Sequence, residues 1–346
     1  MKELRLYIPI ALFMLLAAAA CESEIEFKGS EVEPKIVIYS LLNPDSLVTV
    51  TIAESHAVFE TRYEPRQITD ASVRLYRDGE LIETLTYVPA EPVPEYYPAY
   101  PYSRYVSREH KPVHGSTYRI EVDVKGLESA WGETRLPEPV PVISVDTGSV
   151  IFEEYTGEVK IKLKFRDPAD TDNYYRLTAR ALTGTYLGKS DVPYDPFFPV
   201  TVYDSDIGYG ALSEPLIAPQ QEDDLFGMYL RNDFYLFMDE LIDGKEYSLT
   251  LAYSYPGPLA IDHYEFIHAY FSLHTITKDV YLYLQSYSAQ RQTIDNFLAE
   301  PVPVYTNITG GLGVVGAVSV STDTLKAGEY PVEGVYYDYQ AYYNIK

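Results

Sequence analysis

Hydrophobic and polar residues alternate with a period of two along several short stretches of residues 35–137, which predicts half-buried β-strands. In LVTVTIAES, the residues Val48, Val50 and Ile52 share one face, and threonines share the other. ASVRLYRDGELIETLTYV predicts two strands joined at Asp78-Gly79, a dipeptide typical of hairpin turns. KIVIYSLL, STYRIEVDVKG and ESAWGETRLP show related patterns. About seven short strands predict an N-terminal immunoglobulin-like β-sandwich over this region.

More alternating stretches follow the proline-rich residues 138–142, which predict an extended linker. In EVKIKLKFRDP, lysines occupy one face and apolar residues occupy the other: Val159, Ile161, Leu163 and Phe165. We expect NYYRLTARAL to pair with this strand, and KEYSLTLAYSY to form another. The pattern predicts a larger C-terminal β-rich domain over residues 143–346, with a second sandwich as one possible arrangement.

One stretch in this second region has the period of a helix. In TKDVYLYLQSYSAQRQTIDNFL, the residues Val280, Leu284 and Tyr287 recur at helical spacing. Thr277 stands where an N-cap residue is expected, because a threonine hydroxyl can accept a backbone N–H there. The sequence thus predicts a mostly β chain with one main α-helix at about residues 277–294.

A short element recurs before one strand of each predicted domain. Gly115-x-x-Tyr118 matches Gly244-x-x-Tyr247, and an alternating strand follows both. A tyrosine in such a place can tie its hydroxyl back to a turn, as in the tyrosine corner of sandwich domains. Chance similarity between two strands is the alternative.

The N-terminus carries an unbroken apolar run at residues 6–20 after a short basic start. The run is shorter than the roughly 20 apolar residues of a membrane-spanning helix, and it matches a secretory signal peptide. Cys21, the chain's single cysteine, follows directly, as in bacterial lipoproteins whose first mature residue is lipidated. We expect a signal peptide at 1–20, lipid attachment at Cys21 and an acidic tether at 21–34. Cleavage elsewhere, with an incidental cysteine, is the alternative.

The net charge is -24, from 27 basic and 51 acidic residues spread along the chain. Clustered Lys and Arg bind nucleic-acid phosphates, so this balance argues against nucleic acid as a partner. A solvated acidic surface is the simpler interpretation, and cation binding is the alternative. If Cys21 is acylated, no thiol is left for disulfides or thiolate chemistry.

Gly311, Gly313 and Gly316 match G-x-G-x-x-G, the glycine pattern of dinucleotide-binding loops. Such a loop opens a helix whose N-terminus faces the phosphate. Here AVSVSTDTL follows, and its alternation predicts a strand, so we expect no nucleotide. We expect a glycine-bent turn that shapes the second domain's core through positive φ angles or close backbone approach. A loop that faces a partner is the alternative.

A loop between two predicted strands carries three carboxylates, Asp167, Asp170 and Asp172. Oxygen clusters of this kind bind calcium, but the glycine and distal glutamate of an EF-hand loop are missing. A solvated acidic turn is the alternative. The six histidines form no zinc motif, and G-x-S-x-G is absent. We therefore expect a non-catalytic protein whose one cofactor candidate is calcium.

Tyrosine is the other compositional outlier, with 35 residues. It favours strands and amphipathic surfaces, and it is a preferred contact residue of binding loops. EYYPAYPYSRY interleaves tyrosine with proline, which excludes a central strand. This stretch predicts either an aromatic binding surface or a cover for its own sheet edge, and its tyrosines are Tyr96, Tyr97, Tyr100, Tyr102 and Tyr105.

Several stretches, among them CESEIEF, ITDASVRLYRDGELI and LPEPVPVISV, resemble the lipoproteins of domain of unknown function 4249. The most specific is FLAEPVPVYTNITGGLGVVGAVS, whose signature residues we interpret as structural: Pro301, Tyr305, Asn307, Gly310, Gly311, Gly313 and Gly316. The resemblance spans nearly the whole mature chain. It implies an outer-membrane lipoprotein whose gene often lies near that of a TonB-dependent receptor, and it supplies no catalytic residue.

The expected function is that of a non-catalytic outer-membrane lipoprotein, facing the periplasm or the cell surface. It would act as an accessory or binding component with a TonB-dependent receptor in uptake or surface assembly. Two alternatives stay open. A surface adhesin or fimbria-type subunit would polymerise by strand exchange. A secreted hydrolase would show a cleft with convergent acidic, histidine or nucleophilic groups.

Overall fold

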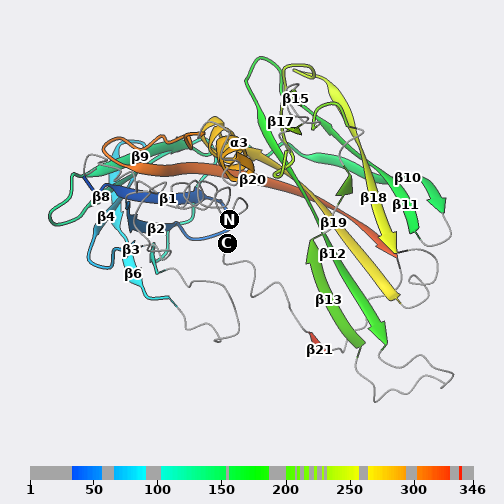
Figure 1. The fold of residues 1–346 in the computed structure, drawn as a ribbon, viewed down its shortest axis with the longest axis horizontal. Helices are drawn as coiled ribbons and strands as arrows, with labels where there is room; N and C mark the ends of the chain where they lie inside the picture. Colours follow the sequence, from blue (N-terminus) through cyan, green and yellow to red (C-terminus); the bar gives the residue numbers. More distant parts are fainter. Residues whose placement is uncertain are drawn as a thin grey trace, which may run out of the picture. The chain divides into compact units, whose positions relative to one another are not determined.

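The described part of the chain is mostly β, with one described helix, α3 (Lys278–Thr293) (Figure 1). The computed structural model describes residues 33–56, 66–90, 103–152, 156–186, 200–206, 209–210, 214–217, 222–223, 228–229, 232–256, 264–293, 302–327 and 335–336. The predicted fold class, a mostly β chain with sandwich-like sheets, is confirmed. In these ranges no helix has both the length and the apolar character needed to cross a bilayer.

The largest sheet has 11 strands. Two of them lie off its main path: β17 (Leu236–Met238) pairs with β12, and β3 (Arg66–Gln67) pairs with β2. The order along the main path is β21 (Val335–Tyr336), β13 (Val200–Asp206), β12 (Tyr174–Tyr186), β19 (Tyr264–Ile276), β20 (Leu312–Ala327), β1 (Ile36–Leu42), β2 (Thr49–Glu54), β7 (Arg104–Val106) and β6 (Thr86–Val88).

Two four-stranded sheets and one two-stranded sheet complete the described strands. The first has the order β5 (Glu80–Thr84), β4 (Ser72–Arg77), β8 (Thr117–Asp123) and β9 (Ala130–Arg135). The second has the order β10 (Val142–Phe152), β11 (Thr156–Arg166), β18 (Glu246–Pro256) and β14 (Tyr209–Gly210). The small sheet pairs β15 (Glu222–Asp223) with β16 (Met228–Tyr229).

The first hydrophobic core joins one part of the large sheet to the sheet of β4 and β8. Val50 and Ile52 of β2 are buried in it together with Leu75 and Ile120. Their alternation with exposed or half-buried neighbours is the predicted pattern of strands with one buried face. The predicted hairpin also forms, because β4 and β5 are joined by Asp78 and Gly79 with positive φ angles of 50° and 87°.

The second core joins the other part of the large sheet to the sheet of β11 and β18, and it buries Leu163 and Phe271. The prediction that NYYRLTARAL pairs with EVKIKLKFRDP was wrong. β11 pairs with β10 and β18, whereas β12 pairs with β13, β17 and β19. The chain between β11 and β12 crosses from one sheet to the other, and the rings of Phe165 and Tyr175 meet across the core at 5.6 Å.

The predicted linker at residues 138–142 is hydrogen-bonded to the large sheet. The Val140 N–H donates to Thr275 Oγ1 at 3.1 Å, and the Val142 N–H donates to Ser321 Oγ at 2.8 Å. The domain boundaries that we drew at this linker stay a prediction.

The two Gly-x-x-Tyr elements share their local geometry. Gly115 and Gly244 have positive φ angles of 74° and 69°. The Tyr118 hydroxyl accepts the Val113 N–H at 2.9 Å, which closes a turn in the manner of a tyrosine corner. The Tyr247 hydroxyl instead donates to Glu214 Oε1 at 2.7 Å. Only the first element therefore ties back to the backbone just before it.

Strand β20 belongs to both parts of the large sheet (Figure 1). Its first residues pair in parallel with β1, from Val37 opposite Leu312 to Leu42 opposite Ala317. Its remaining residues pair antiparallel with β19, beginning at Val318. The expected glycine-bent turn is therefore largely strand, and it lies against a strand of the first predicted domain rather than only in the second core.

Close contact with the backbone of β1 explains why two positions of the signature segment are glycine. Gly313 has a φ of 102°, and a Cβ added there would lie 2.1 Å from the Ile38 carbonyl oxygen. A Cβ on Gly311 would lie 2.5 Å from the Ile36 carbonyl oxygen. Any side chain at either position would push β20 away from β1, so glycine is required for the parallel pairing.

We expect Gly313→Ala to destabilise the fold by at least about 3 kcal/mol, because overpacking against Ile38 adds to the strain of a positive φ. Gly126→Ala is the matched control, since Gly126 also has a positive φ, 89°, but a Cβ there meets nothing within 4 Å. The control should lose only about 1–2 kcal/mol. Urea unfolding of both variants measures the difference. Equal losses would show that the approach to Ile38 imposes no constraint.

Candidate functional site

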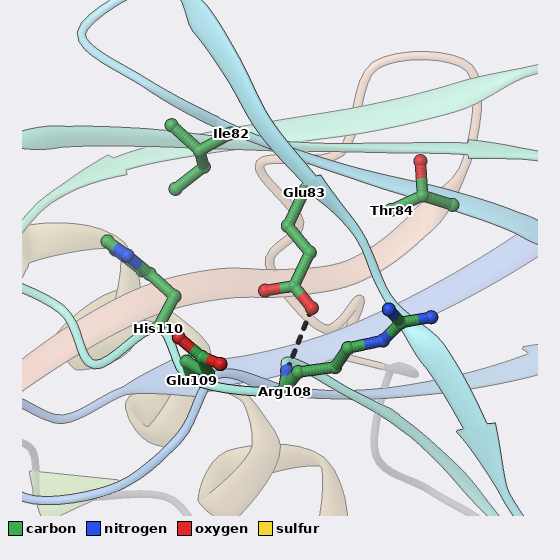
Figure 2. A pocket seen from close by; sticks show the side chains of 6 residues that line it. All are labelled: Ile82, Glu83, Thr84, Arg108, Glu109 and His110. Carbon is green, nitrogen blue, oxygen red and sulfur yellow. Dashed lines mark hydrogen bonds between the residues drawn. The ribbon is translucent and has the colours of Figure 1, made fainter.

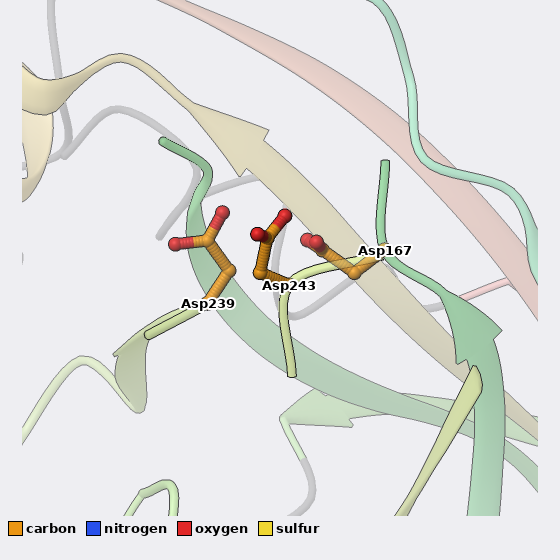
Figure 3. Close-up of side chains that lie close together, drawn as sticks. All are labelled: Asp167, Asp239 and Asp243. Carbon is orange, nitrogen blue, oxygen red and sulfur yellow. The ribbon is translucent and has the colours of Figure 1, made fainter. Parts of the chain in front are cut away.

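Three carboxylates converge where two loops meet at the ends of the strands (Figure 3). Asp167 directly follows β11, Asp239 directly follows β17, and Asp243 lies shortly before β18. Each residue offers a carboxylate oxygen within 4.8 Å of the other two. Asp167 and Asp239 are buried, with 1% and 7% of their surfaces exposed, and Asp243 is exposed.

Hydrogen bonds from both loops hold these carboxylates. Asp167 accepts the Tyr175 hydroxyl at 2.5 Å and the Gly244 N–H at 3.1 Å. Two further bonds cross between the loops: Asp239 Oδ2 accepts the Asn173 N–H at 2.7 Å, and Asp243 Oδ1 accepts the Asp170 N–H at 3.0 Å. The cluster therefore fastens residues 167–173 to residues 239–244.

The environment of Asp167 raises the pKa of its carboxyl above the ordinary range. Burial is the main cause, and the nearby charges of Asp239 and Asp243 add to it. The hydrogen bonds from Tyr175 and Gly244 oppose the shift because they stabilise the ionised form. Burial and the bond to Asp167 also raise the pKa of Tyr175, which keeps that hydroxyl a donor.

Of the three predicted calcium ligands, only Asp167 enters this cluster. Asp170 and Asp172 are exposed, and Asp170 faces Asp243 with its backbone N–H rather than with its carboxylate. The residues that join Asp167 are Asp239 and Asp243, which sequence reasoning missed. They lie far along the chain, and the short stretch DELIDG is their only local signal.

The cluster suits a hydrogen-bonded clasp better than a calcium site. Calcium takes about 6–8 oxygen ligands. This cluster offers three carboxylates, and each of them already accepts at least one N–H or O–H donor. The oxygens that remain are too few for a calcium shell without further ligands.

A cavity of about 700 Å³ lies beside this cluster. Its wall combines the end of β9, residues of the loop after Asp167, and the start of α3. Charged side chains of both signs line it, among them Arg135 and Lys278, which are basic, and Glu138 and Asp172, which are acidic. Of these four residues, the sequence pattern singled out only Asp172, as a calcium candidate.

A second cavity, of about 690 Å³, lies between β5 and residues 108–110 (Figure 2). The Arg108 N–H donates to Glu83 Oε1 at 2.8 Å. His110 Nε2 forms a hydrogen bond with the Tyr118 hydroxyl at 3.1 Å, and burial lowers the pKa of His110. These polar groups hold the loop to the sheet, so this cavity is the weaker candidate for a ligand.

The structure places one residue of the predicted tyrosine surface, Tyr105, in the core. This residue is 2% exposed on β7, and its ring packs on Tyr87. Its hydroxyl accepts the Ala71 N–H at 2.9 Å and donates to the Ile68 carbonyl at 3.2 Å. Tyr105 is thus a core residue, because strand alternation turns it inward. The other four tyrosines of that prediction, Tyr96, Tyr97, Tyr100 and Tyr102, lie outside the described residues. Cys21, the predicted lipidation site, lies outside them as well.

The signature segment is tied to its surroundings by side chains. The Tyr305 hydroxyl donates to Asp279 Oδ1 at 2.6 Å, at the start of α3. Asn307 accepts the Val315 N–H at 3.0 Å and donates to the Val315 carbonyl at 2.8 Å, which secures β20. A Cβ on Gly310 would lie 2.4 Å from the Ser129 carbonyl oxygen, and Pro301 lies outside the described residues.

One serine and one histidine come close together without forming an accessible nucleophile. His114 Nδ1 lies 3.2 Å from Ser319 Oγ. Ser319 is fully buried, and its hydroxyl donates to the Pro137 carbonyl at 2.7 Å. A substrate carbonyl cannot reach a hydroxyl in this position, so the pair serves packing.

The comparisons with known proteins agree with the family resemblance. The family model described as "Domain of unknown function (DUF4249)" matches residues 22–324, which is most of the chain. No curated protein matches this sequence.

We expect Tyr175→Phe to cost about 1–3 kcal/mol at neutral pH, because Asp167 loses a donor to its buried carboxylate. A carboxyl with a raised pKa binds protons more tightly in the folded state, so its ionised form opposes folding above that pKa. The loss should therefore shrink as the pH falls below the raised pKa of Asp167, where this carboxyl becomes protonated. Urea unfolding at several pH values tests this. Tyr87→Phe is the control, and a loss independent of pH would contradict the coupling.

We expect calcium to leave the melting temperature unchanged, because the clasp is already closed by hydrogen bonds. Thermal unfolding in millimolar calcium and in chelator measures this. A rise in the melting temperature that disappears in Asp239→Asn would instead identify the cluster as a calcium site.

Proposed function

The chain belongs to the DUF4249 family, and we propose that it is a lipid-anchored, non-catalytic binding protein of the outer membrane that works with a TonB-dependent receptor. The observation that carries this proposal is Cys21, which directly follows a signal-like apolar run. Acylation by two or three chains on such a cysteine would hold the protein stably at a membrane, where a single chain would not.

The described fold supports binding rather than catalysis. Several of its buried or half-buried polar groups are engaged with one another: Asp167 with Tyr175, Ser319 with Pro137, and His274 with Thr178 at 2.8 Å. Burial lowers the pKa of His274 to about 4, so this imidazole is neutral at physiological pH. A rigid β scaffold with a lined cavity suits recognition of a partner or ligand.

The receptor as partner rests on the family resemblance and on the acidic charge. A net charge of -24 favours partners with basic surfaces, and it speeds their association at low salt. The adhesin alternative requires an exchanged strand between copies, and no observation in the described strands favours that arrangement over the present one.

We expect the tagged full-length chain to fractionate with outer membranes and to enrich a TonB-dependent receptor after gentle solubilisation. Cys21→Ala should release the protein from the membrane and abolish the enrichment, because the acyl chains would be missing. Ser23→Ala is the matched control, since it changes a neighbouring residue and keeps the cysteine. Mass spectrometry of the purified material identifies the partner.

Three outcomes would count against the proposal. Membrane retention of Cys21→Ala would refute the anchor. Membrane-bound protein without an enriched receptor would refute the partner. Ordered polymers of the chain itself would favour the adhesin alternative.

A further inference from the structure

The hydroxyl of Thr134 is buried without a partner. Thr134 is 5% exposed and lies in the wall of the cavity of about 700 Å³. Among the described residues, no group forms a hydrogen bond with its Oγ1. A buried hydroxyl without a partner destabilises a fold, so its place in a cavity wall points to a ligand that hydrogen-bonds there.

The start of helix α3 contributes donors to the same cavity. Thr277 occupies the N-cap position, since its carbonyl accepts the Tyr281 N–H at 3.0 Å. Its hydroxyl accepts the Ala317 N–H of β20 at 3.4 Å, and within the described residues it accepts no N–H from the first turn of α3. The first-turn N–H groups at Lys278 and Asp279, both in the wall, therefore favour an anionic group. The side chain of Lys278 adds positive charge.

The edge of β9 adds a backbone surface. β9 ends its sheet, and Trp131 exchanges N–H and carbonyl bonds with Thr309 on the side away from β8. Antiparallel alternation turns the N–H and carbonyl of Arg135 to that same side. Thr309 occupies this side at Trp131, and the Glu133 carbonyl accepts Asn307 Nδ2 at 3.5 Å. The N–H and carbonyl of Arg135, at the end of the strand, are the groups to which the backbone of a peptide can add.

The charges in the wall have both signs. Arg135 and Lys278 are opposed by Glu138 and Asp172, and all four are exposed. Asp279 is engaged separately, because its carboxylate accepts the Tyr305 hydroxyl at 2.6 Å. A simple anion would meet two carboxylates, and a simple cation would meet two basic groups. A ligand that carries both charges satisfies both pairs.

We propose that this cavity binds a short zwitterionic peptide. Its carboxylate lies at the start of α3, near Lys278 and Arg135. Its backbone runs along the end of β9 beside Thr134, and its cationic group faces Asp172 and Glu138. The inference deepens the proposed binding function and rests on it, since it names the chemistry of what the protein recognises.

Isothermal titration calorimetry on the purified full-length chain tests the site with the tripeptide Ala-Leu-Ala. The free peptide should bind, and its C-terminal amide and N-acetyl forms should each bind at least about tenfold more weakly, because each lacks one charge. Acetate alone should bind more weakly still. No binding of the free peptide, or equal binding of all three forms, would overturn the proposal. Binding of acetate as tight as that of the peptide would show a plain anion site instead.

Variants separate this site from a structural role. Lys278→Ala should weaken peptide binding about tenfold, whereas Lys125→Ala, at an exposed turn away from the cavity, should not. Thr134→Val should weaken binding several-fold and also raise the melting temperature of the free protein, because the buried hydroxyl is removed. Unchanged binding in both Lys278→Ala and Thr134→Val would overturn the assignment. If the peptide does not bind but the receptor is enriched, this site is refuted and the proposed function stands. If the peptide binds but no receptor is enriched, only the receptor as partner is refuted.

Discussion

The parallel contact between β1 and the start of β20 is the constraint on which the described fold depends. At Ile36 and Ile38, the carbonyl oxygens of β1 come so close to Gly311 and Gly313 that no side chain fits. This contact joins the N-terminal strands to a strand from near the end of the chain. Parallel pairing of such distant segments requires a large loop closure, which packing of both cores must offset. The glycines make that packing possible because they remove the steric barrier.

The same contact positions the cavity that we assign to a ligand. The Ala317 N–H of β20 donates to the Thr277 hydroxyl at the start of α3. Thr309, just before β20, pairs with Trp131 of β9. Gly316 lies under Val280, where a Cβ would meet the Val280 side chain at 2.1 Å. The end of β9 and the start of α3 are thus both fixed relative to β20. The signature residues act through this framework, so they shape the cavity without lining it.

The buried carboxylate of Asp167 joins two loops through hydrogen bonds rather than through close backbone packing. Its ionised form is disfavoured by burial, and donors from Tyr175 and Gly244 compensate for part of that cost. The result is a clasp between two loops at the end of the second core, adjacent to the cavity. Asn173 belongs to both, since its N–H donates to Asp239 and it also lines the cavity. A change in the clasp would therefore alter one wall of the proposed peptide site.

Local patterns in the sequence determined the elements. The alternation at Val48, Val50 and Ile52 predicts β2, because it depends only on near neighbours. For the same reason Asp78-Gly79 predicts the hairpin of β4 and β5, and the helical period predicts α3. The family could also be identified from short stretches. Tertiary structure alone decided which strands pair, why Tyr105 is core rather than surface, and how Asp167 meets Asp239 and Asp243. It also brought Thr134 and Lys278 to one cavity. These contacts join residues far apart along the chain, and they follow from the burial of facing surfaces, which periodicity does not encode.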